Sequence, residues 1–217
     1  DQQQWTMAST DGAGPGLAME CVAAALGYIS LEEAAERVLL TLRSFSGLTS
    51  GFNDARNDGG WLPTFINSDT GECFGDPNFG CLFSSDSTAF NTIGVLFAKT
   101  FFERTAPKLA STAEIIRLAS SLYSRVKWQR LFCSELVGID ELSTVSMQGP
   151  YIPWLYNSSN GCRDSFGLAS DGLYYFSEMH WLVWLAHESA CGAGMPPCGP
   201  NHPMELLWNR WEGRANA

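Results

Sequence analysis

The sequence predicts an all-α protein built from antiparallel helical hairpins, with one small β-hairpin. Three observations support this class. Six segments of the 217 residues repeat apolar side chains at intervals of three and four, which is the spacing of a buried helix face. Strand-like patterning is confined to one region rich in Gly and Pro. Hydrophobic residues make up 45% of the chain and charged residues 17%, a composition that excludes a disordered protein and a coiled coil.

The six helices are predicted in chain order at residues 16–27, 30–46, 85–104, 112–132, 171–190 and 203–212. Residues 16–27 are small or apolar almost throughout, as in a helix that is buried on most sides. Residues 30–46 open with a capping box, in which Ser30 is followed three residues later by Glu33. Residues 85–104 are again apolar nearly throughout. The first three helices therefore each have their own sequence signal.

The last three helices have weaker but distinct signals. Residues 112–132 begin at Ser111 or Thr112, either of which is a suitable N-cap. Residues 171–190 are rich in aromatic side chains, and residues 203–212 start with Pro at the first helical position. Short helices joined in sequence order favour consecutive antiparallel pairs, with the long loops gathered at one end.

The small β-hairpin is predicted in the connection between the second and third helices. Residues 59–75 read GGWLPTFINSDTGECFG, in which the turn falls at Asp69-Thr70-Gly71. A second long loop spans about residues 134–170, and no linker divides the chain. We therefore expect a single domain over residues 1–217.

The charge balance indicates a neutral ligand. The chain has 13 basic and 23 acidic side chains, a net charge of −10, and a pI near 4.6. This balance argues against nucleic acid and anionic membranes as partners. No stretch approaches the roughly 18 consecutive apolar residues of a membrane span. The 8 Trp, 6 Tyr and 13 Phe must be buried or stacked on something flat. The sequence alone leaves the oligomeric state open.

Cysteine positions favour an extracellular, secretory-pathway or periplasmic protein. Six of the seven Cys lie in or beside predicted loops, and one lies in the first predicted helix. Two pairs close short loops and a third is a further candidate: Cys73 with Cys81, Cys191 with Cys198, and Cys133 with Cys162. No CxxC pair is present and the three His do not form a metal signature, so we predict no metal and no cofactor.

Several strings in this order resemble the bacterial glycoamylase-like domain family, which includes endo-β-1,2-glucanases. The strings are GLAMECVAAALGYISLEEAAERVLLTLRSF, GGWLPTFINSDTGE, SDSTAFNTIGVLFA, AEIIRLASSLYSRVKW, YYFSEMHWLVWLAHESACG and WNRWEG. They cover roughly residues 8–213. The resemblance implies an (α/α)6 toroid and a hydrolase of β-glucan-type bonds. Because a complete toroid has twelve helices, we expect this chain to hold part of one.

The chain departs from the family pattern at two places. The family reads Glu-Leu-Ser-Thr-Ile-Asp-Thr-Ala, whereas this chain has Leu82 in place of the leading Glu. Asp86 is one residue away from the family's Asp, which aligns with Ser87. The Asn of the family's Tyr-Asn-Glu is Ser177 here, preceded by Phe176.

Glu178 and Asp86 are the candidate catalytic carboxyl groups. Glycoside hydrolysis needs a protonated acid and, on the other side of the bond, a base or nucleophile. Glu178 follows two tyrosines and Phe176, and such aromatic neighbours would favour its protonated form. Asp86 is expected at a helix N-cap, where a carboxylate accepts backbone N–H groups and stays ionised. The simpler alternatives are an exposed helical Glu and an ordinary cap.

The candidate substrate-binding residues are Trp61, Trp154, Tyr175, Ser177, Asp54 and Asp58. Trp61 and Trp154 lie in loops flanked by Gly or Pro, where an aromatic face can stack on a sugar. Tyr156 is a further candidate for such stacking. Trp181 and Trp184 are helical, so we expect them in the core. The carboxylates of Asp54 and Asp58 could bind sugar hydroxyls or calcium, although a solvated turn is the simpler interpretation.

The leading hypothesis is a metal-independent glycoside hydrolase acting on a β-glucan, such as β-1,2-glucan, with an oligo- or polysaccharide as its partner. A second hypothesis is a carbohydrate-binding relative that has lost catalysis, suggested by Leu82 and Ser177. A third is a polysaccharide lyase, which needs basic residues to hold a uronic acid, and few Lys and Arg lie near the candidate residues.

Overall fold

The computed structural model describes residues 6–75 and 80–128, with short stretches at 152–153, 155–156, 169–170, 184–185 and 187–188. The elements are, in order, β1 (Met7–Ser9), α1 (Thr10–Ala25), α2 (Leu31–Phe45), β2 (Phe65–Asn67), β3 (Phe83–Ser84), α3 (Ser85–Thr105), α4 (Thr112–Arg125), β4 (Ile152–Pro153), β5 (Leu155–Tyr156) and β6 (Ala169–Ser170). The mostly helical class and the small β-hairpin are confirmed.

Contacts between Cα atoms divide the chain into two compact units. The first holds residues 1–81 and 87–126, and the second holds residues 82–86 and 127–217. The single domain over residues 1–217 stays a prediction. Within the described residues, no helix is both long enough and apolar enough to cross a membrane.

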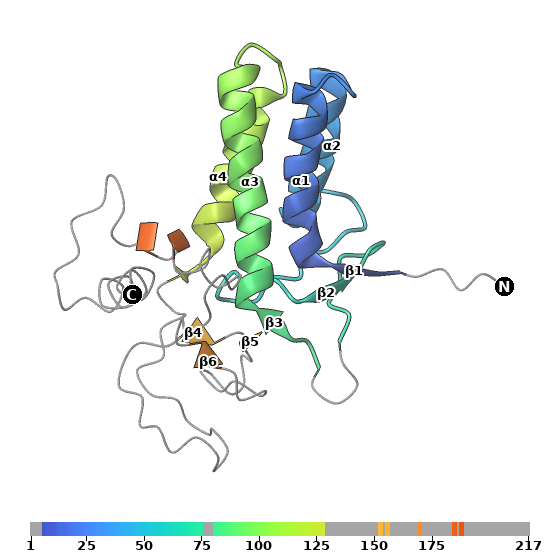
Figure 1. The fold of residues 1–217 in the computed structure, drawn as a ribbon. Helices are drawn as coiled ribbons and strands as arrows, with labels where there is room; N and C mark the ends of the chain where they lie inside the picture. The colour runs from blue at the N-terminus through green and yellow to red at the C-terminus, as the bar shows by residue number, and fades with distance from the viewer. Residues whose placement is uncertain are drawn as a thin grey trace. The chain divides into compact units, whose positions relative to one another are not determined.

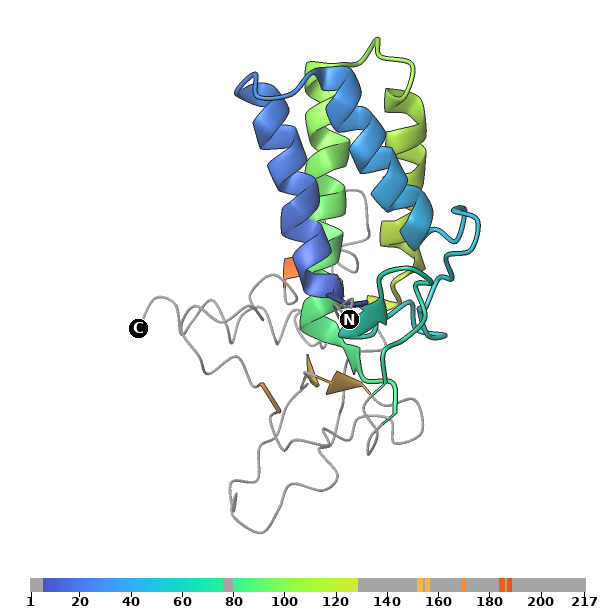
Figure 2. The ribbon, with the colours of Figure 1, turned by 90° about the vertical axis from the view of Figure 1, so that its right-hand side faces the viewer.

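The four helices of the first unit form two antiparallel hairpins, α1 with α2 and α3 with α4, that lie side by side (Figures 1 and 2). Residues 57–75, which follow α2, lie at the end of the bundle where α1 begins (Figure 1). Helix α2 packs against both α1 and α4. The core takes buried side chains from all four helices, among them Leu17, Cys21, Val38, Leu42, Phe102, Ile115 and Leu118.

Helix α1 begins at Thr10, six residues before the predicted start at residue 16. The glycines and the proline of this segment predict a helix break. Packing against α3 overrides that signal, because a Cβ on Gly14 would lie 2.0 Å from the carbonyl oxygen of Phe90 and one on Gly94 would lie 2.1 Å from that of Gly14. Glycine lets the two backbones approach this closely, and the contact holds the first turns of α1 in place.

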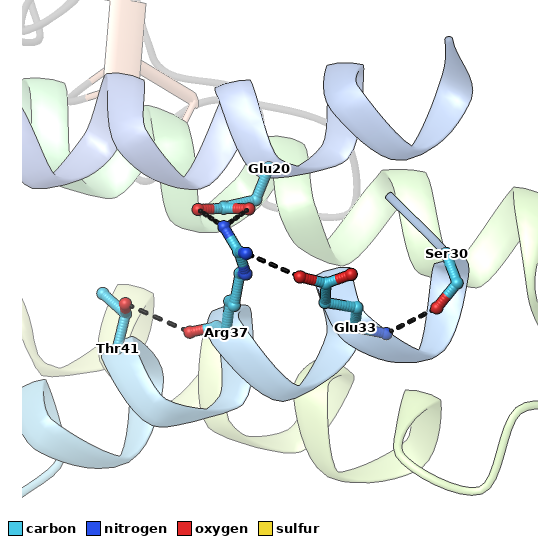
Figure 3. Close-up of polar contacts among 5 residues, drawn as sticks. All are labelled: Glu20, Ser30, Glu33, Arg37 and Thr41. Atoms are coloured by element: carbon cyan, nitrogen blue, oxygen red, sulfur yellow. Dashed lines mark hydrogen bonds and ion pairs between the residues drawn. The ribbon is translucent and has the colours of Figure 1, made fainter. Parts of the chain in front are cut away.

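The predicted capping box of α2 is confirmed. The Ser30 Oγ accepts from the backbone N–H of Glu33 at 3.0 Å (Figure 3). One helical turn later, Arg37 lies 2.6 Å from Glu33 and 3.3 Å from Glu20 of α1. These two carboxylates raise the pKa of the Arg37 guanidinium, and the hydrogen bond with Glu33 is the largest single cause. The network connects the two helices of the first hairpin along their exposed edge (Figure 3).

The β-hairpin is confirmed, and it has a partner that the sequence did not reveal. Backbone hydrogen bonds join Asn67 to Glu72 at 2.8 Å and Phe74 to Phe65 at 2.9 Å across the turn. Its strand β2 also pairs antiparallel with β1, with Ser9 opposite Phe65. The Cys73–Cys81 disulfide is present as predicted. The other two predicted bridges lie outside the described residues.

Helix α3 agrees with its prediction within one residue, but α4 ends at Arg125 instead of residue 132. Ser111 is the N-cap of α4, one of the two predicted candidates. Val126 is extended, and a Cβ on Gly60 would lie 2.2 Å from the carbonyl oxygen of Arg125. The loop therefore packs against the end of α4. Of the predicted helix at 171–190, residues 184–185 and 187–188 are described and helical. The predicted helix at 203–212 lies outside the described part.

Candidate functional site

A tight turn after α2 orders the loop that carries several predicted site residues. The Asn57 Oδ1 accepts from the backbone N–H groups of Gly59 at 2.9 Å and Trp61 at 3.0 Å. The backbone of Asn57 also bonds to Trp61 and to Gly60. Gly60 has a φ of +79°, a left-handed conformation that favours glycine. The loop is thus fixed by its own side-chain and backbone hydrogen bonds.

Asp54 is held between two arginines. Its Oδ2 lies 2.7 Å from Arg125 Nη2 at the end of α4, and its Oδ1 lies 3.5 Å from Arg56 Nε. The Arg56 side chain is 4% exposed and also donates to the carbonyl of Gly60 at 3.1 Å. Burial lowers the pKa of Arg56 to about 10, Asp54 opposes that effect, and Arg125 adds to it. Both carboxylate oxygens of Asp54 face arginine, so this geometry indicates a structural role and does not favour sugar binding by Asp54.

The exposure of Trp61 and Trp184 is the opposite of what the sequence predicts: Trp61 is buried and Trp184 is exposed. Trp61 is 1% exposed, so the prediction that its loop position leaves a face open for stacking is wrong. Its neighbour Leu62 donates its backbone N–H to the Thr88 Oγ1 at 2.9 Å, which draws this part of the loop against α3. Trp184 is helical but 39% exposed, so the expectation that it lies in the core is also wrong.

The beginning of α3 carries a buried polar face that sequence reasoning missed. Ser87, Thr88, Asn91 and Thr92 are each at most 4% exposed. The Thr92 Oγ1 donates to the carbonyl of Thr88 at 2.7 Å. The Asn91 Nδ2 is buried without a hydrogen-bond partner in the structure. Their spacing of three and four residues was a usable signal, because polar residues repeated along one helix face that is otherwise apolar predict a polar lining.

Asp86 is 9% exposed and lies in the first turn of α3. The helix already includes Ser85, so Asp86 is its second residue and the predicted N-cap position is wrong. A carboxylate in the first turn still interacts favourably with the helix dipole. Just before Asp86, β3 pairs antiparallel with β5, with Ser84 opposite Leu155. The pairing joins the segment that leads into Asp86 to the segment that follows Trp154 in sequence.

The remaining predicted residues are divided by what the structure describes. Asp58 is exposed, in agreement with a solvated turn. Glu178, Tyr175, Ser177 and Trp154 lie outside the described residues, as does Trp181.

Within the described part of the chain, no three His, Cys, Asp or Glu side chains are grouped so that they could hold a metal ion. A shallow pocket of about 400 Å³ lies at the junction of the α2 start and the α3–α4 loop. It is lined by Leu31, Glu32 and residues 105–109, and it contains none of the predicted site residues.

Solved structures with a similar fold include a putative glucoamylase and two β-1,2-glucanases. A putative glucoamylase from Bacteroides uniformis is 17% identical with a TM-score of 0.67, over 97% of this chain and 42% of that one. A β-1,2-glucanase from Parabacteroides distasonis is 18% identical with a TM-score of 0.64, over 97% of this chain and 26% of that one. An endo-β-1,2-glucanase from Chitinophaga pinensis, solved with sophorotriose and glucose, is 16% identical with a TM-score of 0.63, over 96% and 41%. No family model and no curated protein matches the sequence.

The comparisons confirm the fold that the sequence resemblance implied. The chain has the fold of part of a glucoamylase-like α/α toroid, and it spans less than half the length of each of these structures.

Proposed function

We propose that this chain forms part of a glycoside hydrolase that cleaves β-1,2-linked glucan by carboxylate acid/base catalysis. The supporting observation is the fold similarity to two β-1,2-glucanases over 96–97% of the chain, a range that includes α3 and its buried Asp86. The acidic composition agrees with a neutral glycan as the substrate.

In the proposed reaction, Glu178 donates its proton to the leaving glycosidic oxygen while the bond to the anomeric carbon breaks. A water molecule attacks that carbon, and Asp86 accepts the water's proton. The position of Asp86 in the first turn of α3 supports this assignment, because the helix dipole favours the charged carboxylate. The sum of the steps is one water consumed and one new reducing end formed.

The pairing of β3 with β5 supports a role for Trp154 in the same site. Leu155 pairs with Ser84, which lies two residues before Asp86 in the sequence. Trp154 is the residue before Leu155 in the sequence. In the proposed site, the indole ring of Trp154 would stack on the ring of the bound sugar.

The decisive experiment measures turnover and binding separately. The purified protein is incubated with β-1,2-glucan and with sophorotriose, and new reducing ends are counted. Glu178→Gln should lower the rate by about 100-fold or more, the usual contribution of a general acid. Glu103→Gln, a matched change at an exposed position of α3, should leave the rate unchanged.

The alternative is a carbohydrate-binding relative without catalysis, which Leu82 and Ser177 favour because they depart from the enzyme family's pattern. Calorimetric binding of sophorotriose with no product from any β-glucan would support this alternative. If the chain neither binds sophorotriose nor releases product from any β-glucan, the proposed function is overturned for this chain. Equal activity of Glu178→Gln and the parent would overturn the assignment of the acid.

A further inference from the structure

One face of α1 is apolar, uncharged and exposed. We call it the α1 seam and define it as Gly12, Pro15, Gly16, Met19, Val22 and Leu26. Gly12, Gly16, Met19, Val22 and the C-cap residue Leu26 follow one another at intervals of three or four, and Pro15 adjoins Gly16, so the set forms one stripe along the helix. Met19 and Leu26 are each 64% exposed and Val22 is 38% exposed. The opposite face of α1 carries Leu17 and Cys21, which are buried in the core.

The acidic side chains of α1 do not interrupt the seam. Glu20 turns toward α2 and pairs with Arg37 at 3.3 Å (Figure 3). Asp11 accepts from the Ser9 hydroxyl and from the backbone N–H of Gly12 at 2.8 Å. Between residues 12 and 28, Glu20 is the single charged residue in the sequence. A stripe several turns long therefore meets water without a charged group.

The exposed face of α2 has the opposite character. Its exposed positions include Glu32, Glu33, Glu36 and Arg37, with Leu40 as an isolated apolar residue. That pattern is typical of a helix with one solvated face, whereas a helix that is apolar all round is a buried helix. Of these two neighbouring helices, α1 is therefore the one whose exposed face has the apolar composition of a packing surface.

We propose that the α1 seam packs against an apolar, uncharged helix from a further α/α hairpin of the same toroid, carried by polypeptide outside residues 1–217. The solved structures with this fold have more than half of their length outside the match, enough for additional hairpins. Gly12 and Gly16 would let a neighbouring helix approach closely, as Gly14 and Gly94 do on the other side of α1. The inference depends on the fold and not on the proposed activity.

Cysteine labelling tests the proposal. Met19→Cys is prepared in the 217-residue chain and in the polypeptide made from the native gene, and its maleimide modification is followed by peptide mass spectrometry. In the 217-residue chain the thiol should react fast, as an exposed residue does. In the native polypeptide the rate should fall by at least about tenfold, because a packed helix excludes the reagent.

Two control variants calibrate the rates. Lys108→Cys, in the exposed α3–α4 loop, should react equally fast in both proteins, and Leu17→Cys, at a position 2% exposed, should react slowly in both. Fast labelling of Met19→Cys in the native polypeptide would overturn the proposal. Slow labelling already in the 217-residue chain would overturn it too: sedimentation as a dimer would identify a second copy as the occupant, and a monomer would show that the chain covers its own seam.

Discussion

Arg125 donates to Asp54 over 2.7 Å, and this ion pair connects the last turn of α4 to the loop that follows α2. Asp54 also faces the buried Arg56, so one carboxylate is the shared ion-pair partner of two guanidinium groups. Asp54 therefore adds an ion pair to the contacts that Gly60 makes with α4 and Leu62 makes with α3. The same loop carries Asp58 and Trp61, so Asp54 contributes to the geometry of this end of the bundle.

Asp54→Asn should lower the free energy of unfolding by about 3 kcal/mol. The change keeps the shape of the side chain but leaves the nearly buried Arg56 beside Arg125 without an opposing charge. Urea unfolding measures the loss. Asp69→Asn, at an exposed position of the hairpin turn, is the matched control and should change little. A loss of the same size in both variants would mean that the arginines are not what makes Asp54 important.

Gly14→Ala should destabilise the protein by about 1–3 kcal/mol or more, because the new methyl group would meet the backbone of Phe90. In the 217-residue chain, a Cβ on Gly16 of the same helix has nothing within 4 Å, so Gly16→Ala should stabilise that chain by up to about 1 kcal/mol through helix propensity. Thermal unfolding of the two variants gives opposite shifts. Shifts of the same sign would contradict the close packing of α1 on α3.

Stability should fall as the pH rises above 9, because of Cys21. Burial raises the pKa of the Cys21 thiol from 9.0 to about 12, and the nearby Glu20 adds to the effect. Below pH 9 the thiol is protonated in both states and its contribution is complete. Above pH 9 the unfolded chain loses the proton first, so the contribution declines until the folded thiol titrates near pH 12.

Between pH 9 and pH 10 this decline should amount to about 1 kcal/mol. Arg56, with its pKa lowered to about 10, contributes with the opposite sign at higher pH, so the measurement is kept below pH 10. Cys21→Ala removes the titrating group and serves as the reference, and the difference between the two pH profiles isolates the thiol. Parallel profiles would show that Cys21 is not shielded in solution.

Asp86→Asn should lower turnover of β-1,2-glucan by about 100-fold or more, because an amide cannot accept the proton of the attacking water. Sophorotriose affinity should change little, since the side chain keeps its shape. Reducing-end assays and calorimetry measure the two effects, with Asp69→Asn again as the matched control. Unchanged turnover in a folded Asp86→Asn protein would leave Asp86 as an ordinary first-turn residue of α3.

The parts of the fold that depend on local chemistry could be predicted from the sequence. The capping box of Ser30 and Glu33, the hairpin turn, and the Cys73–Cys81 disulfide each involve residues close together in the chain. The helical bounds of α2 and α3 follow from periodicity in the same way. In these segments the local preference and the tertiary structure agree.

The errors have a common physical origin in long-range packing. Gly14 marks a helix break by propensity, but its contact with α3 makes it helical. Trp61 lies in a loop, yet it is buried in the folded chain, and nothing in the sequence signals that the side chain of the loop residue Arg56 is buried. Exposure of a side chain is set by the whole fold, so it is the property of the candidate site that sequence reasoning predicted least well.

The pairing of β1 with β2 has a consequence for how the protein folds. Ser9 pairs with Phe65, and closing the long segment between them costs entropy that falls once the α1–α2 hairpin has compacted this part of the chain. Helices and their short connections form in microseconds, whereas contacts between distant segments wait for loop closure. We therefore expect the helical hairpins to form first and this strand pair to close late. The N-terminal strand β1 would then pair with β2 in a late folding step, after the helical hairpins have formed.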